Sequence, residues 1–232
     1  MAKSGNTERE QRILDAAANL FIHYGFDKTA ISDIARDAGV SQGAIYLHFA
    51  NKEDLLEHLI LREMQRFAED WLQRIEADPD GGRLGGMYKN MLYALSSSPF
   101  LAATFRQDGR VFGNYLRKPD NFFRNIQIGD NRSPRYEFVK RMQDAGALRQ
   151  DIDAKVIAHI MNMLAFGMIG MDEIVPAQEI PPLNDLIEGI ATIMDRALTP
   201  DGVDSEIGKA IVRQIFDVTR HEYEQSEAPE QE

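Results

Sequence analysis

Two short stretches of helically spaced apolar residues, separated by a single glycine, constrain the fold of this chain more than any other feature. The first stretch places Ile34 and Ala38 on one face, and Gly39 follows directly after it. Glycine readily adopts the left-handed conformation that ends a helix, because it has no Cβ. Ser41 can then cap a second short helix, which we expect to run through about Phe49. The pattern predicts two helices joined by a tight turn.

Longer helical patterns flank this pair on both sides. Thr7 and Glu10 form a capping box at the start of a helix expected over about 7–24. Behind the pair, Asn51 begins an amphipathic pattern of about 25 residues, which ends at the breaker cluster 77–82, the best candidate for a domain boundary. This order is typical of a helix-turn-helix, whose second short helix enters the major groove of DNA.

Beyond residue 82 the apolar spacing stays helical, and no strand alternation competes with it. Further helices are expected over about 84–98, 99–117, 135–145, 154–172, 183–198 and 204–224. The stretch 118–134 is polar and expected to be irregular, and 175–182 to be a rigid connector.

The predicted fold class is all-α. A three-helix helix-turn-helix domain over 1–52 is joined by a long helix to a larger helical ligand-binding and dimerisation domain over 53–224. The acidic tail 225–232 is expected to be disordered.

Composition bounds the setting of the protein. The chain has 232 residues, of which 44% are hydrophobic and 27% charged, and it has no cysteine. No apolar run approaches the length of a membrane span, and the N-terminus lacks the apolar core of a signal peptide. We therefore expect a cytoplasmic protein with no membrane partner. The histidines lack metal-ligand spacing, so neither a metal nor a cofactor is predicted.

Charge is distributed unevenly along the chain. Residues 1–52 hold six basic and six acidic side chains, so the rest of the chain carries the whole net charge of −11. An acidic body repels phosphate and would leave the neutral end to face DNA.

The string TAISDIARDAGVSQGAIYLHFANKEDLL, residues 29–56, resembles the DNA-binding signature of the TetR family of bacterial regulators, and the similarity extends back through 13–26. Past residue 56 the resemblance rests on helix order alone. It implies an all-helical homodimer, usually a repressor, that binds a palindromic DNA operator. A small apolar or amphipathic effector would bind the C-terminal domain and release the DNA. An activator or an effector-independent regulator is the alternative.

The resemblance also assigns a set of residues to DNA: Thr29, Ser41, Gln42, Gly43, Ala44, Tyr46, Leu47, His48 and Lys52. Gln42 stands where the family often has lysine, and it is the expected base reader. Tyr46 and His48, on the exposed face, and Lys52 are expected to contact phosphates. Leu47 is expected either to contact a thymine methyl group or to make no contact with DNA.

Each of these assignments has a structural alternative. Thr29 and Ser41 are expected to cap helices and so place backbone N–H groups near a phosphate, but they could be caps alone. Tyr46 could be a half-buried packing residue, and His48 could interact with a helix end.

The C-terminal body is rich in aromatic and methionine side chains, which serve cores and ligand pockets alike. The candidates for an effector pocket are Met91, Phe105, Phe112, Tyr115, Met161, Asn162 and Phe166. Core packing is the alternative for the apolar ones. Asn162 and His159 face either a dimer partner or a ligand. Three arginines, Arg106, Arg110 and Arg117, would either meet an anionic group or be solvated.

Small residues in the helices near 154–172 and 183–198 would allow close helix contact, and the resemblance assigns the homodimer interface to the same pair. The helix over 204–224 would extend that interface or cover the pocket.

Two other classes of protein compete with a regulator. An all-helical enzyme is disfavoured because no paired-carboxylate motif, glycine-rich phosphate loop or nucleophile with a base partner is present. A helical scaffold that never binds DNA is disfavoured by the four residues Gln42, Tyr46, His48 and Lys52. The protein is therefore not expected to be an enzyme.

Overall fold

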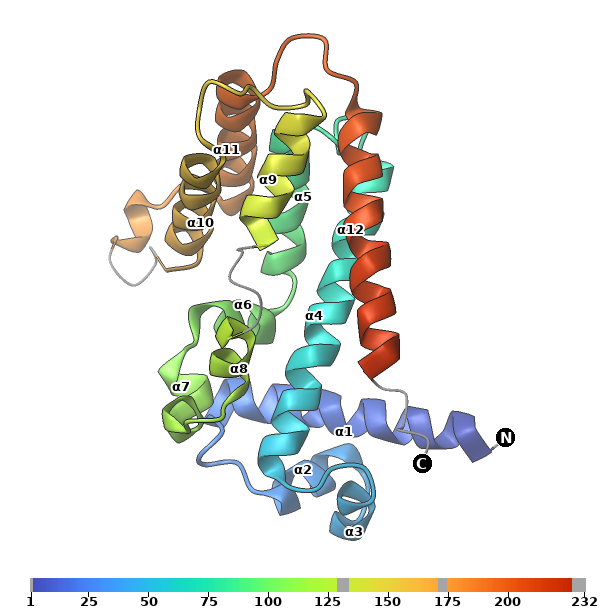
Figure 1. Cartoon of the computed structure of the whole chain (residues 1–232). Helices are drawn as coiled ribbons and strands as arrows, with labels where there is room; N and C mark the ends of the chain where they lie inside the picture. The colour runs from blue at the N-terminus through green and yellow to red at the C-terminus, as the bar shows by residue number, and fades with distance from the viewer. Residues whose placement is uncertain (1, 129–133, 171–174, 227–232) are drawn as a thin grey trace. The chain divides into compact units, whose positions relative to one another are not determined.

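A computed structural model describes residues 2–128, 134–170 and 175–226 of the chain. Every element within these ranges is helical (Figure 1), which confirms the predicted fold class. The elements are α1 (Ala2–Tyr24), α2 (Ile31–Ala38), α3 (Gln42–Tyr46), α4 (Lys52–Ala77), α5 (Leu84–Ser96), α6 (Pro99–Arg106), α7 (Gly109–Phe112), η1 (Gly113–Arg117), α8 (Phe122–Ile128), α9 (Pro134–Asp144), α10 (Ala154–Gly170), η3 (Ala177–Glu179), α11 (Leu183–Leu198) and α12 (Ser205–Ser226).

The chain forms two compact units. The head unit comprises Met1–Arg66 and Ser97–Asn131, and the body unit comprises Phe67–Ser96 and Arg132–Glu232. The division therefore falls within α4, and the breaker cluster 77–82 is a turn inside the body unit instead of a boundary. The two units are defined by packing and not by function. The predicted DNA-binding domain over 1–52 and the predicted ligand-binding domain over 53–224 therefore stay predictions.

The head unit has a core of its own. Apolar residues of α1 to α4 are fully buried at its centre, among them Ile13, Phe21 and Ile45. Phe112 and Tyr115 join them from the later segment, and α6 and α7 pack on α1. The helix-turn-helix is therefore completed by residues that are distant in the sequence.

Two predictions about the later segment of the head unit are wrong. The expected single helix over 99–117 is three elements, because Gln107 and Gly113 adopt positive φ angles of 50° and 52° that interrupt it. The stretch 118–134, expected to be irregular, contains α8. Asn121 caps this helix by accepting a hydrogen bond from Arg124 N at 3.2 Å, and Phe122 packs against the core.

Four helices, α5, α9, α10 and α11, surround the core of the body unit together with the end of α4. Tyr88, Val139 and Ile157 are buried there, α5 packs on α11, and α9 packs on α10. No helix in the described ranges is long and apolar enough to cross a membrane.

The last helix, α12, is part of the body unit. The Arg213 guanidinium pairs with the Glu76 carboxylate at 2.6 Å, and the Phe216 ring lies 5.9 Å from the Trp71 ring. The helix continues through Ser226, past the residue at which disorder was expected to begin, and the remaining predicted tail, 227–232, lies outside the described residues.

The turn 81–82 lies against the first turn of α12 at backbone distance. Gly82 N donates to Ser205 Oγ at 2.8 Å, and a Cβ added at Gly208 would lie 1.9 Å from the Gly82 carbonyl oxygen. An alanine in a helix is ordinarily more stable than a glycine by about 1 kcal/mol. At Gly208 the backbone would have to move, which costs more than this gain.

We expect Gly208→Ala to lower the free energy of unfolding by about 2 kcal/mol or more in urea titration. The matched control is Gly109→Ala, because a Cβ at Gly109 meets no atom within 4 Å. The control should change stability by less than about 1 kcal/mol. Equal effects of the two substitutions would contradict the tight contact between the turn and α12.

Candidate nucleic-acid interface

The turn between α2 and α3 has the predicted geometry. Gly39 has φ 65° and ψ 38°, in the left-handed region, and Val40 N donates to Ala35 O at 2.9 Å to end α2. The Ser41 hydroxyl caps α3 by accepting a hydrogen bond from Ala44 N at 3.2 Å. These contacts confirm the predicted roles of Gly39 and Ser41 in local structure.

The start of α2 differs from the prediction. Thr29 does not cap this helix, because the residue at the cap position is Ala30, whose N–H donates to Asp33 Oδ2 at 3.3 Å. Thr29 is buried, and its hydroxyl donates to Gly25 O at 2.8 Å, which ties it to the turn after α1. The predicted cap at Thr29 is therefore wrong.

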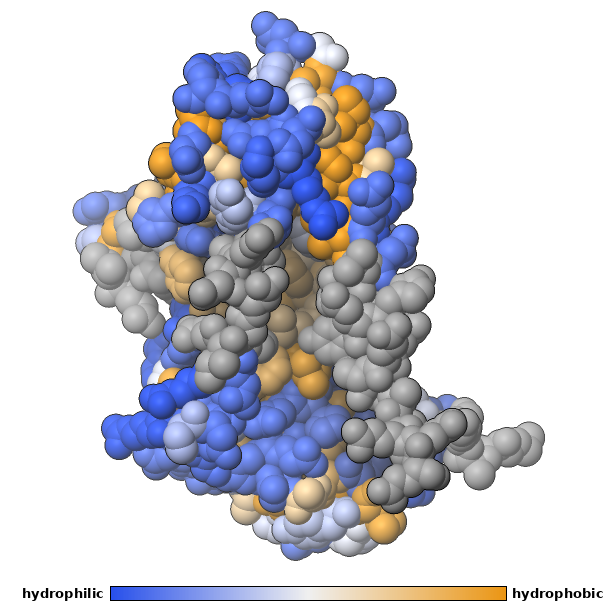
Figure 2. Space-filling view, viewed as in Figure 1, coloured by the Kyte–Doolittle hydropathy of each residue, from blue (hydrophilic) through white to orange (hydrophobic). Residues whose placement is uncertain are grey.

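One face of α3 is open to solvent. Gln42 and Gly43 are exposed, Tyr46 is 54% exposed and Leu47 is 81% exposed. Figure 2 shows apolar and pale surface among the polar residues at the end of the head unit where Figure 1 places α3. Ala44 is half-buried, and the helix ends at Tyr46, earlier than the predicted Phe49.

His48 does not lie on this exposed face. Its side chain is only 6% exposed, and its Nδ1 lies 3.8 Å from the Glu10 carboxylate of α1. Its Nε2 is buried and has no hydrogen-bond partner among the described residues. The predicted outward orientation of His48 is therefore wrong, because the ring turns inward between α1 and the end of the α3 segment, and the predicted phosphate contact stays a prediction.

Lys52 is also turned away from the exposed face. Its Nζ donates to Phe26 O at 2.8 Å and to Thr29 O at 2.9 Å, and lies 4.2 Å from the centre of the Phe26 ring. Burial lowers the pKa of this ammonium group. The ammonium group is hydrogen-bonded to the carbonyl oxygens of the loop between α1 and α2, and the predicted phosphate contact stays a prediction.

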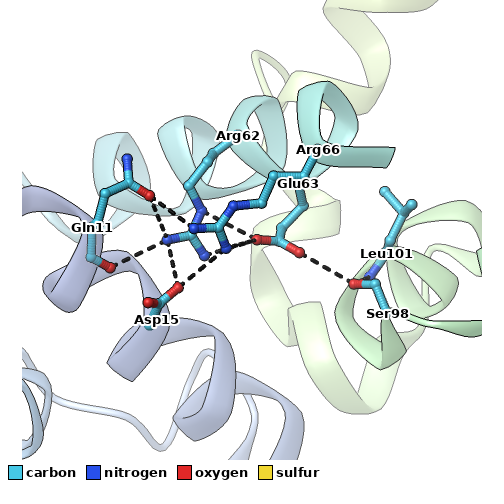
Figure 3. Close-up of polar contacts among 7 residues, drawn as sticks. All are labelled: Gln11, Asp15, Arg62, Glu63, Arg66, Ser98 and Leu101. Atoms are coloured by element: carbon cyan, nitrogen blue, oxygen red, sulfur yellow. Dashed lines mark hydrogen bonds and ion pairs between the residues drawn. The ribbon is translucent and has the colours of Figure 1, made fainter. Parts of the chain in front are cut away.

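A polar network that sequence reasoning missed joins three helices of the head unit (Figure 3). The Arg62 guanidinium of α4 donates to Gln11 O of α1 at 3.2 Å, pairs with Asp15 at 2.8 Å and pairs with Glu63 at 2.8 Å. Glu63 in turn accepts from the hydroxyl of Ser98, the N-cap of α6, at 3.2 Å. The helix pattern places Arg62 and Glu63 on α4, but nothing in it indicates partners so distant in the chain.

The seven candidate pocket residues do not share one unit. Phe105, Phe112 and Tyr115 belong to the head unit, while Met91, Met161, Asn162 and Phe166 belong to the body unit. A cavity of ≈ 700 Å³ in the head unit, between the end of α1 and the α6–α7 segment, is lined by none of the seven.

Phe112 and Tyr115 are core residues of the head unit. Phe112 is fully buried, and the Tyr115 hydroxyl donates to Glu57 Oε1 at 2.7 Å and accepts from Phe122 N at 2.8 Å. Burial raises the pKa of Tyr115 well above its ordinary value. These two residues pack in the core, which was the alternative to a role in a ligand pocket. Phe105 and Phe166 are instead exposed.

Two of the three candidate anion-binding arginines, Arg106 and Arg110, pair with the carboxylate of Asp108, at 3.6 Å and 2.8 Å. The Asp108 carboxylate is therefore an anionic partner of both arginines in this structure. Among the residues that the structure describes, no group of three or more histidine, aspartate or glutamate side chains could hold a metal ion.

The sequence of this chain is similar to those of known regulatory proteins. Residues 13–59 match the family described as bacterial regulatory proteins, tetR family. The fatty acid metabolism regulator protein of Bacillus subtilis is 42% identical over 67 residues, which are 29% of this chain and 32% of that protein. An HTH-type transcriptional repressor of Mycobacterium tuberculosis is 25% identical over 163 residues, 69% of this chain and 80% of the repressor.

The fold extends the similarity beyond the first helices. The crystal structure of the regulator FadR from Bacillus subtilis, in complex with stearoyl-CoA, matches with a TM-score of 0.58 at 20% identity and covers 79% of this chain and 96% of that one. This chain spans about a third of the length of the fatty acid regulator in the sequence match.

The position of Lys52 leads to a test that separates a structural role from phosphate binding. Lys52→Met should lower the free energy of unfolding by about 1–3 kcal/mol, because two carbonyl oxygens lose a charged donor. Lys28→Met, at an exposed lysine of the same unit, should leave stability within about 0.5 kcal/mol of the wild type. Equal stability of the two variants would contradict the structural role. A lower salt dependence of DNA binding in Lys52→Met would indicate a phosphate contact.

Proposed function

We propose that this chain, whose residues 13–59 match the tetR family of bacterial regulatory proteins, is a homodimeric repressor of transcription that binds a palindromic operator and is released by a small molecule. The observation that carries this proposal is the exposed face of α3, held by the Gly39 turn and the Ser41 cap inside the segment that matches the family. Its work on DNA would take place in the cytoplasm.

The proposed DNA contacts are the residues that α3 leaves open. Gln42 can present an amide to a base edge, and Gly43 and Ala44 allow the backbone to approach the groove. Tyr46 can donate to a phosphate, and Leu47 can meet a thymine methyl group. The charges of residues 1–52 sum to zero, so general attraction to phosphate is weak and a fitted dimeric site must supply the affinity.

The operator can be found by selection from random double-stranded DNA, followed by mobility-shift titration at low salt. We expect Gln42→Ala to weaken binding to the selected operator about tenfold or more, since a bidentate base contact contributes about 1–3 kcal/mol. The control is Gln73→Ala, at an exposed glutamine of α4, which should bind as the wild type does. Failure to select or shift any DNA would sink the proposal.

The surface of α10 and α11 supports the proposed dimer. Val156, Ile160 and Met163 recur at helical spacing on α10 and are exposed, and Ile193 on α11 is 68% exposed. Gly189 on α11 has no atom within 4 Å of an added Cβ, so a partner helix could approach closely there. These are the helices near 154–172 and 183–198 that the sequence assigned to dimerisation.

A charge placed on this surface tests the interface. Ile193→Asp should raise the dissociation constant of the dimer roughly a hundredfold or more in sedimentation equilibrium. A twofold-symmetric interface would bury one unpaired carboxylate from each protomer. The control is Ile207→Asp on α12, where the isoleucine is 37% exposed. A dimer lost only in the control would instead assign the interface to α12, the open alternative for that helix.

The effector site is proposed in the body unit. The related FadR is known in complex with stearoyl-CoA, which supports a small amphipathic or apolar effector for this chain as well. The relatives are named as regulators and repressors, and this supports a role other than catalysis. An activator would bind the same operator but raise transcription in a reporter assay.

A further inference from the structure

A positively charged side chain that pairs with none of the described carboxylates lies inside the body unit. Arg135, near the start of α9, is half-buried. Its Nη1 donates to Asn162 Oδ1 of α10, and its Nη2 lies 3.6 Å from the sulfur of Met91 on α5. Neither acceptor carries a charge, and Arg135 forms no ion pair with any residue that the structure describes. Three helices thus converge on a guanidinium whose described partners are uncharged.

The nearby tyrosine cannot serve as the counter-ion. The Tyr88 hydroxyl is buried and donates to Met161 O at 2.6 Å. Burial raises the pKa of Tyr88 to about 12, so this group is neutral at physiological pH. Burial also lowers the pKa of Arg135, because it removes water from around the positive charge.

Three other cations of the body unit illustrate the usual pairing with a carboxylate. Lys89 lies 2.8 Å from the Asp78 carboxylate, Arg83 lies 3.5 Å from Asp195, and Arg213 pairs with Glu76. A buried charge is costly unless it is paired and hydrogen-bonded, so such positions usually carry their own counter-ion. Among the residues that the structure describes, Arg135 has no such counter-ion, and an external anion could take that place.

We propose that Arg135 and Asn162 bind the carboxylate group of a small organic acid whose apolar part lies against Met91 and Met161. This inference rests on the proposed function, since it names the chemical class of the effector.

Three features favour a carboxylate over other anions. The guanidinium is planar and can present two parallel N–H groups to the two oxygens of a carboxylate. One guanidinium matches the single charge of a carboxylate, whereas a phosphate monoester brings up to two. Among the described residues the Asn162 amide nitrogen makes no hydrogen bond, so it can donate to the same group.

The apolar surroundings favour an acid with a hydrocarbon body. Met91 and Met161 belong to the core cluster of the body unit, together with Phe138 and Met142. Thioether side chains are flexible and adapt to ligands of irregular shape. An aliphatic or aromatic monocarboxylate therefore suits both ends of the site.

The experiment measures binding to the purified full-length protein without DNA, by isothermal titration calorimetry. The probes are octanoate, phenylacetate and benzoate, with octan-1-ol as the neutral analogue of the first and octyl phosphate as a different anion. At least one carboxylate should bind the wild type, and it should bind Arg135→Gln about tenfold more weakly or worse. The matched control is Arg141→Gln, at an exposed arginine of the same helix, which should bind as the wild type does.

Several results would overturn the proposal: no carboxylate binds, octan-1-ol binds as well as octanoate, octyl phosphate binds more tightly than octanoate, or Arg135→Gln binds carboxylate normally. Circular dichroism of Arg135→Gln checks that it is folded. If it is not, Asn162→Ala takes its place, and the comparison of octanoate with octan-1-ol on the wild type needs no variant.

The outcome is separable from that of the proposed function. A carboxylate that binds through Arg135 but never alters operator binding would support the site and refute its role as an effector site. If the protein binds an operator and only neutral compounds release it, the proposed function is supported and the carboxylate effector is refuted.

Discussion

The left-handed turn at Gly39 is the constraint on which the candidate interface depends. It ends α2 within one residue and lets Ser41 begin α3 at once, so that Ala35 and Ile45 are buried while Gln42 and Tyr46 stay outside. A side chain with a Cβ would resist this backbone conformation. The exposed face of α3 is thus a consequence of one backbone geometry more than of the polarity of the residues on that face.

Charged groups that the sequence places on helix surfaces turn out to organise the interior. Lys52 holds the loop between α1 and α2, and Arg62 joins α1 to α4 within the head unit. In both cases carbonyl or carboxylate oxygens offset the loss of water around the cation. Arg135 is the contrasting case in the body unit, because its partners in the described part of the chain are an amide oxygen and a sulfur.

The head unit also shows why aromatic residues are ambiguous in a sequence. Phe112 and Tyr115 were candidates for a ligand pocket, yet they complete the core beneath the helix-turn-helix. A three-helix head has little apolar surface to bury by itself, and the segment 97–131 supplies the rest. Changes in that segment therefore act directly on the packing of α1, on which α6 and α7 lie.

The sequence by itself determined most of the helices, the Gly39 turn, the Ser41 cap, the long α4 and the resemblance to the tetR family, because each depends on neighbouring residues or on one periodic pattern. Only the tertiary structure decided where Thr29, His48 and Lys52 point, that the segment 97–131 completes the head core, and that Arg135 lacks a counter-ion among the described residues. Those facts depend on which distant segments meet in space, and the same residue types suit a surface, a core or a site until that contact is known.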